Sequence, residues 1–233
     1  MARVRKITRN PNPGKNYYLV DANFLVNRFI PPAIAPNAHQ KQRIELCDEW
    51  WVEIEGQLKR NKARVYVPDI CIAESFKTLA KKYYEEKWFK SAVTLNSARK
   101  QLAKFISVPA KTLKATKREI KVHDISTTRD LVISVDRFYE LFHKYKKKVS
   151  LPDLIVVATA KYLVDFYDIP RDRLHIVTLD TGLWEGTKKI QELPNAYNPT
   201  QTSDKRQLIF QDNQNGSQPP RFHATLVLAC RRA

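Results

Sequence analysis

The chain has 233 residues, of which 43% are hydrophobic and 28% charged, enough for one large domain or two small ones. Its 41 lysines and arginines exceed its 24 acids, and the formal net charge of +17 favours a polyanionic partner, nucleic acid first. The three cysteines are far apart without C-x-x-C spacing, which argues against a disulfide framework or a cysteine zinc site. No apolar run reaches the ~18 residues that span a bilayer.

Residues 1–16 combine five basic side chains with prolines and a glycine, and we expect a basic N-terminal arm there. Such an arm either contacts phosphate or is a solvated tail. No apolar stretch of signal-peptide type follows it. Together with the cysteine pattern, this favours a reducing, cytoplasmic setting without a membrane partner.

The apolar, aromatic run over 17–20 predicts a buried strand that ends at Asp21. Asp21 is expected to cap a short helix that runs toward Arg28, before two prolines stop it. A long helix is predicted over 39–61. Its two adjacent tryptophans either pack in the core or stack on bases, and core packing is favoured.

A second strand is predicted over 64–67, followed by a helix that begins near Asp69. The apolar stripe expected on this helix consists of Ile72, Phe76, Leu79 and Tyr83. Glu74 lies on the opposite side from that stripe, so it can face the same edge of the sheet as Asp21. A plain exposed glutamate is the alternative interpretation.

A further helix is predicted over 88–106, an edge strand over 118–125, and a helix capped by Thr127 or Thr128 that runs to about residue 145. Basic side chains before and after that last helix are candidate nucleic-acid contacts: Lys111, Lys114, Lys117, Arg118, Lys146, Lys147 and Lys148. The three lysines that follow the helix also complement its dipole, a purely structural interpretation.

Pro152 suits the first turn of a buried apolar helix, which places Asp153 in the same turn. The next strand is predicted over 175–179 and leads directly into Asp180, with Thr178 and Thr181 near enough to hydrogen-bond it. Residues 191–233 are expected to form a C-terminal extension, with two edge strands over 206–210 and 222–229 or a partly disordered tail.

Strands alternate with helices along the chain, which predicts a mainly parallel sheet with helices on both faces. Sites in such sheets form beyond the carboxyl ends of the strands, where Asp21, Glu74, Asp153 and Asp180 could meet. Four carboxylates at one edge repel one another unless a cation neutralises them. Oxygen ligands favour Mg²⁺ or Mn²⁺, which can activate water for attack on a phosphodiester.

Four segments, in this order, resemble those of the PIN-domain ribonuclease family: Tyr18-Leu-Val-Asp21-Ala-Asn23, Val67-Pro-Asp-Ile-Cys-Ile-Ala-Glu74, Leu151-Pro-Asp153-Leu-Ile-Val-Val, and Val177-Thr-Leu-Asp180. The resemblance covers residues 17–190, with a helical insertion around 88–125, and implies a three-layer α/β/α sandwich. It also implies an Mg²⁺- or Mn²⁺-dependent endoribonuclease whose products carry a 3′-hydroxyl and a 5′-phosphate.

By this resemblance, the catalytic and metal-binding acids are Asp21, Glu74, Asp153 and Asp180. Asn23 would support the first acid, and Thr178 or Thr181 the last. The chain is much longer than the VapC-like toxins of the family, and the resemblance leaves open an antitoxin-like protein partner and a homodimer.

Other enzyme classes fit the sequence less well. A haloacid dehalogenase-type phosphatase needs a second aspartate where this chain has Asn23, and a Rossmann binder needs a glycine-rich turn after the first strand. The alternative to an enzyme is a non-catalytic RNA-binding or scaffold protein with the same fold.

Overall fold

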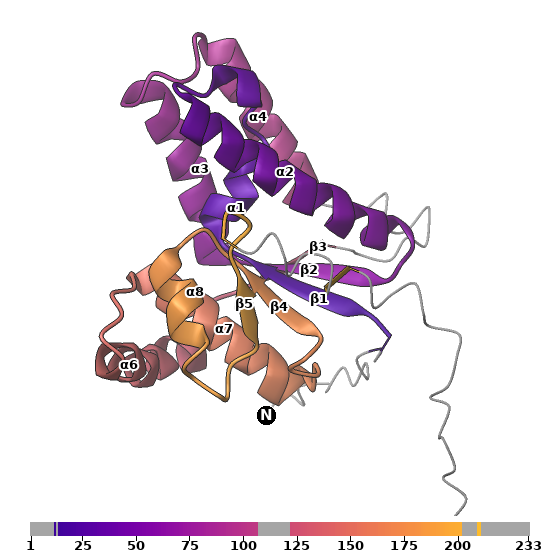
Figure 1. Cartoon of the computed structure of the whole chain (residues 1–233), viewed down its shortest axis with the longest axis vertical. Helices are drawn as coiled ribbons and strands as arrows, with labels where there is room; N and C mark the ends of the chain where they lie inside the picture. The colour runs from indigo at the N-terminus through magenta and orange to yellow at the C-terminus, as the bar shows by residue number, and fades with distance from the viewer. Residues whose placement is uncertain (1–11, 13, 107–121, 202–208, 211–233) are drawn as a thin grey trace, which may run out of the picture. The chain divides into compact units, whose positions relative to one another are not determined.

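The computed structural model describes residues 12, 14–106, 122–201 and 209–210 (Figure 1). The chain divides into two compact units, Met1–Thr202 and Ser203–Ala233. None of the helices among the described residues is both long and apolar enough to cross a membrane.

The centre of the first unit is a parallel sheet of five strands in the order β3-β2-β1-β4-β5. The strands are β1 (Asn16–Val20), β2 (Ala63–Pro68), β3 (Val122–Ile125), β4 (Leu174–Val177) and β5 (Asn195–Tyr197). The parallel sheet and its first two strands are confirmed. The strand predicted over 118–125 is confirmed at the edge of the sheet for its described part, 122–125.

The helices match the apolar periodicity of the sequence closely. They are α1 (Ala22–Asn27), the 3₁₀ turn η1 (Pro32–Ile34), α2 (Ala38–Lys59), α3 (Asp69–Tyr84), α4 (Ala92–Ile106), α6 (Arg129–Lys144), α7 (Leu151–Tyr167) and α8 (Thr181–Thr187). The helix predicted over 88–106 begins later, at Ala92, because Trp88 and Phe89 are buried in the segment that precedes it. The predicted N-cap Asp21 is confirmed, and Thr128 caps α6.

Alternation along β1 assigns the two faces of the sheet. Tyr18 points toward α2, where its hydroxyl donates to Gln57 Oε1 at 2.8 Å. Tyr17 points to the other face and stacks on Tyr66. Helix α7 packs on β1, β2 and β4, and Figure 1 shows α2 and α7 on opposite sides of the sheet. The first unit is therefore a three-layer α/β/α sandwich, as predicted.

Aromatic packing joins α1 to α2 on one side of the sheet. The ring of Trp51 stacks on Phe24 with centroids 4.8 Å apart, and its indole nitrogen donates to the Phe24 carbonyl at 3.3 Å. Trp50 is also buried. Both tryptophans are thus core residues, and neither is available to stack on a base.

The buried line of α3 differs from the predicted stripe. It runs through Cys71, Ser75 and Leu79, while Ile72 and Phe76 are only half-buried. A serine can occupy this line because its hydroxyl lies 2.7 Å from the Cys71 carbonyl and 3.3 Å from the Ala22 carbonyl of α1, within donating distance of both. The close contact of α1 with α3 therefore rotates the buried face by one residue.

The strand β5 lies beyond residue 190, where we expected the main domain to end. It pairs with β4, and the compact unit continues to Thr202, so the domain extends past the predicted boundary. Three residues are too few for a period-two pattern to stand out. Of the two edge strands predicted further on, only Ile209 and Phe210 lie among the described residues, and their backbone is helical.

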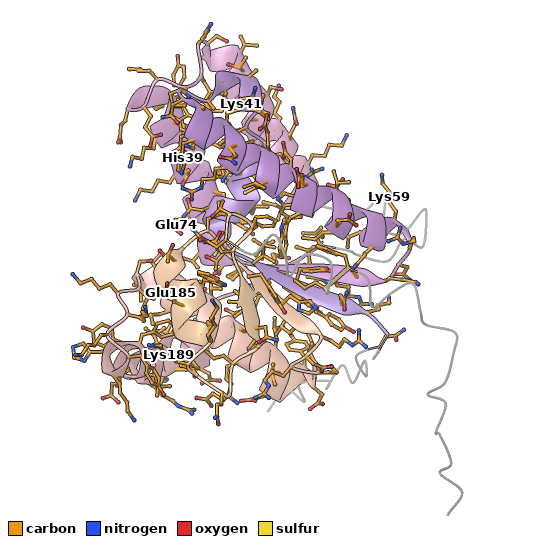
Figure 2. The ribbon with its side chains drawn as sticks, viewed as in Figure 1. His39, Lys41, Lys59, Glu74, Glu185 and Lys189 are labelled. Carbon is orange, nitrogen blue, oxygen red and sulfur yellow. The ribbon has the colours of Figure 1, made fainter. Side chains whose placement is uncertain are left out.

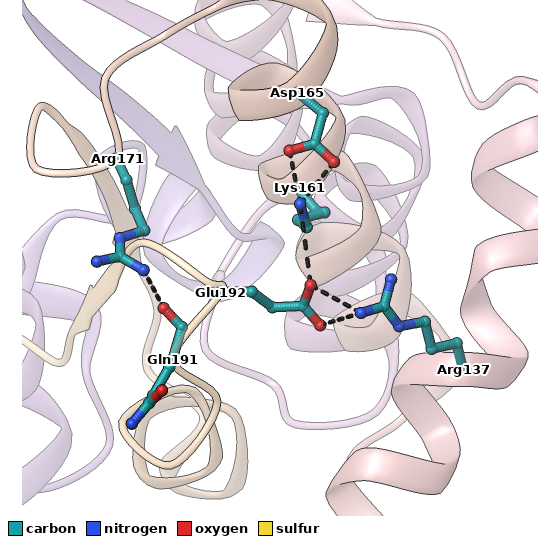
Figure 3. A network of polar contacts seen from close by, with 6 residues as sticks. All are labelled: Arg137, Lys161, Asp165, Arg171, Gln191 and Glu192. Carbon is teal, nitrogen blue, oxygen red and sulfur yellow. Dashed lines mark hydrogen bonds and ion pairs between the residues drawn. The ribbon is translucent and has the colours of Figure 1, made fainter.

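An ion-pair network joins α6 and α7 to the segment that follows α8 (Figure 3). Arg137 of α6 donates to both carboxylate oxygens of Glu192, at 2.6 and 2.8 Å, and Lys161 of α7 lies 3.8 Å from the same carboxylate. Lys161 also pairs with Asp165 at 2.6 Å. Arg137 and Asp165 are largely exposed, so the network orders the segment more than it stabilises the fold.

Gly186 allows α8 to approach α6. A Cβ atom at this position would overlap the ring of the buried Phe142.

We expect Gly186→Ala to destabilise the fold by about 1–3 kcal/mol, because a packed ring must move. The matched control is Gly56→Ala in α2, where the nearest atoms to an added Cβ are 3.7 Å or more away. That change should stabilise by up to about 1 kcal/mol through helix propensity. Chemical denaturation of both variants measures the difference, and equal stabilities would contradict the packing.

Candidate active site

Asp21 lies at the carboxyl end of β1, the middle strand, and only 4% of its surface is exposed. Its Oδ1 accepts a hydrogen bond from the Phe24 amide at 2.6 Å, which makes it the N-cap of α1. Its Oδ2 accepts from the Thr178 hydroxyl and from the Leu179 amide at 3.2 Å. The carboxylate therefore fastens the end of β4 to the end of β1.

Burial raises the pKa of Asp21 to about 6. The hydrogen bonds from Thr178, Phe24 and Leu179 oppose this effect, since they stabilise the charged form, while the charge of Asp153 adds to it. Asp21 is thus an unusually basic carboxylate that is still mostly ionised at neutral pH.

Asp153 is the third residue of α7 and forms a capping box with Ser150. The Ser150 amide and hydroxyl both donate to Asp153 Oδ2, and the Ser150 Oγ accepts from the Asp153 amide at 3.4 Å. The predicted place of Asp153 in the first turn is confirmed. Burial raises its pKa, the Ser150 hydrogen bonds oppose this, and the charge of Asp180 raises it again.

Glu74 is the sixth residue of α3, one turn further along than a helix-start position (Figure 2). It is half-buried, and its pKa is raised by burial and next by the charge of Asp153, with a smaller opposing effect from Lys77. Glu74 is therefore electrostatically coupled to the same aspartate as Asp21.

The sequence suggested that a strand ends at Asp180, and this prediction is wrong. Strand β4 stops at Val177, and Asp180 is the N-cap of α8, with the Leu183 amide donating to its Oδ1 at 2.6 Å. Thr178 supports a different acid from the one expected. Its hydroxyl donates to Asp21, and its oxygen accepts from the Asp180 amide at 2.9 Å.

The other two expected contributors make weaker contacts. Asn23 is exposed in the first turn of α1, and in the part of the chain that the structure describes no hydrogen bond joins its side chain to Asp21. Thr181 is the exposed first residue of α8. Their supporting roles stay predictions.

Gly182 is a contributor that the sequence reasoning missed. A Cβ atom there would collide with the Lys148 carbonyl and would lie 3.1 Å from Asp180 Oδ1. The bare glycine therefore lets the start of α8 approach the segment that leads into α7, which brings Asp180 toward Asp153. A glycine two residues after a candidate acid was the available signal.

The predicted basic contacts are only partly described. Lys111, Lys114, Lys117 and Arg118 lie outside the described residues. Lys146 and Lys148 are exposed after α6, while Lys147 forms an ion pair with Glu185 of α8. Lys147 is therefore partly neutralised within the protein.

The four acids come from four different segments and form one electrostatic neighbourhood centred on Asp153. The charge of Asp153 raises the pKa of Asp21 and of Glu74, and Asp180 raises the pKa of Asp153. Across the described residues, however, no three Asp, Glu, His or Cys side chains stand close enough together to hold a metal ion. The four acids are linked through their effects on one another's pKa values, but they do not form a complete set of ligands.

The carboxylate oxygens that accept no hydrogen bond among the described residues are the kind of ligand that a hard cation binds. In the hydrogen bonds of the described chain, Asp153 uses only Oδ2 and Asp180 only Oδ1. One carboxylate oxygen on each is left for a ligand, as is the carboxylate of Glu74. Oxygen donors of this kind are those that Mg²⁺ and Mn²⁺ prefer.

No protein-family model matches the sequence, and no curated protein matches it. Two similar solved structures are VapBC2 from Rickettsia felis bound to a DNA fragment from its promoter, and FitAcB from Neisseria gonorrhoeae. The first is 14% identical with a TM-score of 0.46 over 78% of this chain and 98% of that chain. The second is 17% identical with a TM-score of 0.46 over 79% and 99%.

The Thr178 hydroxyl should stabilise the ionised form of Asp21. We expect Thr178→Val to cost about 1.5–3 kcal/mol at pH 8, where Asp21 is charged, and about 1 kcal/mol at pH 5, where it is protonated. The cost grows as pH rises through 6, because losing the bond raises the folded-state pKa of Asp21 further. Urea denaturation across this pH range measures it.

The control is Thr159→Val, at another buried threonine, whose hydroxyl donates to the Ile155 carbonyl within α7 at 2.7 Å. Its cost should not change with pH. A Thr178→Val cost that is the same at pH 5 and pH 8 would contradict the assigned bond.

Proposed function

We propose that this protein is a metal-dependent endoribonuclease that hydrolyses RNA phosphodiester bonds at the edge formed by Asp21, Glu74, Asp153 and Asp180. The observation that carries the proposal is the mutual effect of these acids on their pKa values. Three of them have raised pKa values, and each shift has another acid of the group among its causes. Carboxylates whose pKa values are raised by burial and by one another, beyond the strands of a parallel sheet, are typical of functional sites.

The cluster lacks a basic partner of its own. Among the described residues, the main causes that lower the pKa of Asp21 or Asp153 are hydrogen bonds, and none of them is the charge of a lysine or an arginine. A lysine does oppose the shift of Glu74, but Lys77 is exposed and its effect is the smallest of the three. Neutralisation by an added cation would therefore relieve a repulsion that the protein leaves in place.

Asp153 and Asp180 would hold Mg²⁺ or Mn²⁺ through the carboxylate oxygens that their capping bonds leave unused, and Glu74 through its carboxylate. Asp21 would add a further negative charge near the cation. A cation bound there lowers the pKa of a water molecule and stabilises charge on a phosphodiester. Burial raises the pKa of Asp21 to about 6, which suits this carboxylate to accept a proton near neutral pH. The net charge of +17 would attract the RNA.

A second candidate function is RNA binding without cleavage on the same fold. The observation in its favour is that, over the described parts of the chain, no three metal-binding side chains are already close enough for an ion. In that case the acids would repel phosphate locally, and the basic surface alone would bind RNA. The two experiments that follow separate these functions.

Cation binding can be measured without any activity. We expect Mn²⁺ at about 100 times its dissociation constant to stabilise the protein by about 2.7 kcal/mol at pH 7.5. The gain should fall below pH 6, because Asp21 then becomes protonated and neutral. Thermal denaturation with and without Mn²⁺ measures it. Asp153→Asn should abolish the gain.

The matched control is Asp165→Asn, near the other end of α7, where the carboxylate pairs with Lys161. It should keep the full Mn²⁺ response. An equal response from both variants would place the cation elsewhere.

Cleavage tests the reaction itself. We expect unstructured RNA to be cut only with Mg²⁺ or Mn²⁺ present, and Asp153→Asn and Glu74→Gln to lower kcat by about 100-fold or more. Glu85→Gln, at the exposed end of the same helix as Glu74, should leave kcat unchanged. Gel analysis of a labelled RNA, with an EDTA sample as the metal-free blank, measures the metal dependence and the kcat of each variant. RNA that binds but stays intact with both metals would favour the second candidate.

A further inference from the structure

A polar pocket of about 300 Å³ lies beside the acidic edge. Its walls come from the start of α2, from the two residues that flank Asp180, and from the segment after β5: His39, Gln42, Arg43, Leu46, Leu179, Thr181, Asn198, Thr200 and Gln201. Pockets that bind small ligands occupy roughly 300–1,000 Å³, so this one reaches the lower end of that range.

The pocket touches the candidate active site through its own walls. Leu179 and Thr181 line it, and they are the neighbours of Asp180 in the chain. Leu179 is also the residue whose amide donates to Asp21. A ligand in the pocket would therefore lie next to the acids.

Arg43 gives the pocket a positive charge. It is half-buried in α2, and among the residues that the structure describes it forms no ion pair. A guanidinium group is always charged and binds phosphate through two parallel hydrogen bonds. Arg43 is thus available to bind an anion at this place.

The other walls are rich in groups that recognise sugars and bases. The exposed side chains of His39, Gln42, Thr181 and Gln201 supply donors and acceptors. The back wall is rigid, because Asn198 is buried, its Oδ1 accepts from the Thr200 amide at 3.0 Å and from the Thr200 hydroxyl at 2.7 Å, and its amide donates to the Leu179 carbonyl. A fixed wall together with exposed polar side chains suits a ligand with several polar edges.

We infer that this pocket binds one nucleotide of a single-stranded RNA substrate, next to the bond to be cut, with Arg43 on its phosphate. The inference rests on the proposed function, because it takes RNA as the substrate. Figure 2 labels His39 at the N-terminal end of α2 and Lys59 at its opposite end. Arg43 of α2 lines the pocket, whereas Lys59 of the same helix lies outside it, which supplies a control.

Binding is measured by fluorescence anisotropy with a labelled five-nucleotide RNA in EDTA, so that cleavage plays no part. We expect Arg43→Ala to weaken binding by roughly five- to tenfold and to lower the slope of log Kd against log salt by about 0.7, the value for one lost phosphate contact on a single strand. Lys59→Ala removes the same charge from the same helix and should change neither quantity. Equal effects from the two variants, or no effect from either, would overturn the inference.

A second variant keeps the inference testable should Arg43→Ala fold poorly. Gln42→Glu places a negative charge in the pocket at an exposed position and should weaken RNA binding about as much. The control Gln101→Glu makes the same change on α4, outside the pocket. Equal binding by these two variants would overturn the inference.

The cleavage assay separates this inference from the proposed function. If RNA is never cut but Arg43→Ala and Gln42→Glu still weaken binding selectively, the pocket stands and the nuclease proposal fails. If RNA is cut and Arg43→Ala leaves KM unchanged, the nuclease stands and the pocket assignment fails. A DNA strand of the same sequence that binds as tightly as RNA would overturn the assignment to RNA.

Discussion

The site depends on one buried carboxylate. Asp21 ends the central strand, caps α1 through the Phe24 amide, and accepts hydrogen bonds from the Thr178 hydroxyl and the Leu179 amide. These bonds hold together the carboxyl ends of β1 and β4, and Asp180 follows β4 in the chain. A buried charge costs free energy that only such bonds or a cation can offset. The position of Asp21 therefore couples the stability of the sheet edge to its chemistry.

Asp153 links the acids to one another. Its capping box holds the carboxylate at the mouth of a buried helix, and its charge raises the pKa of both Asp21 and Glu74. Gly182 allows the start of α8, with Asp180 as its cap, to approach the segment before α7. Short-range capping thus fixes each carboxylate separately, and the approach of the helices determines how strongly the carboxylates repel one another.

The acids at this edge are negatively charged, and the pocket beside them is positively charged. The acids would attract a divalent cation, and the neighbouring pocket carries Arg43. A nucleic acid needs both, because its phosphate charge must be neutralised where it binds and its bond polarised where it is cut. The pocket adjoins the acids through Leu179 and Thr181, the two chain neighbours of Asp180. The net charge of +17 acts over a longer range and does not select a site.

The sequence by itself determined the order of the first four strands and of the main helices, the cap Asp21, and the place of Asp153 in the first turn of α7, and it narrowed the cap of α6 to Thr127 or Thr128. Apolar periodicity and capping depend on residues close together in the chain. Only the tertiary structure decided that the Thr178 hydroxyl donates to Asp21, that Ser75 lies in the buried line of α3, and that β5 belongs to the sheet. Each of these depends on a partner far away in the sequence, and no local pattern specifies which distant atoms will meet.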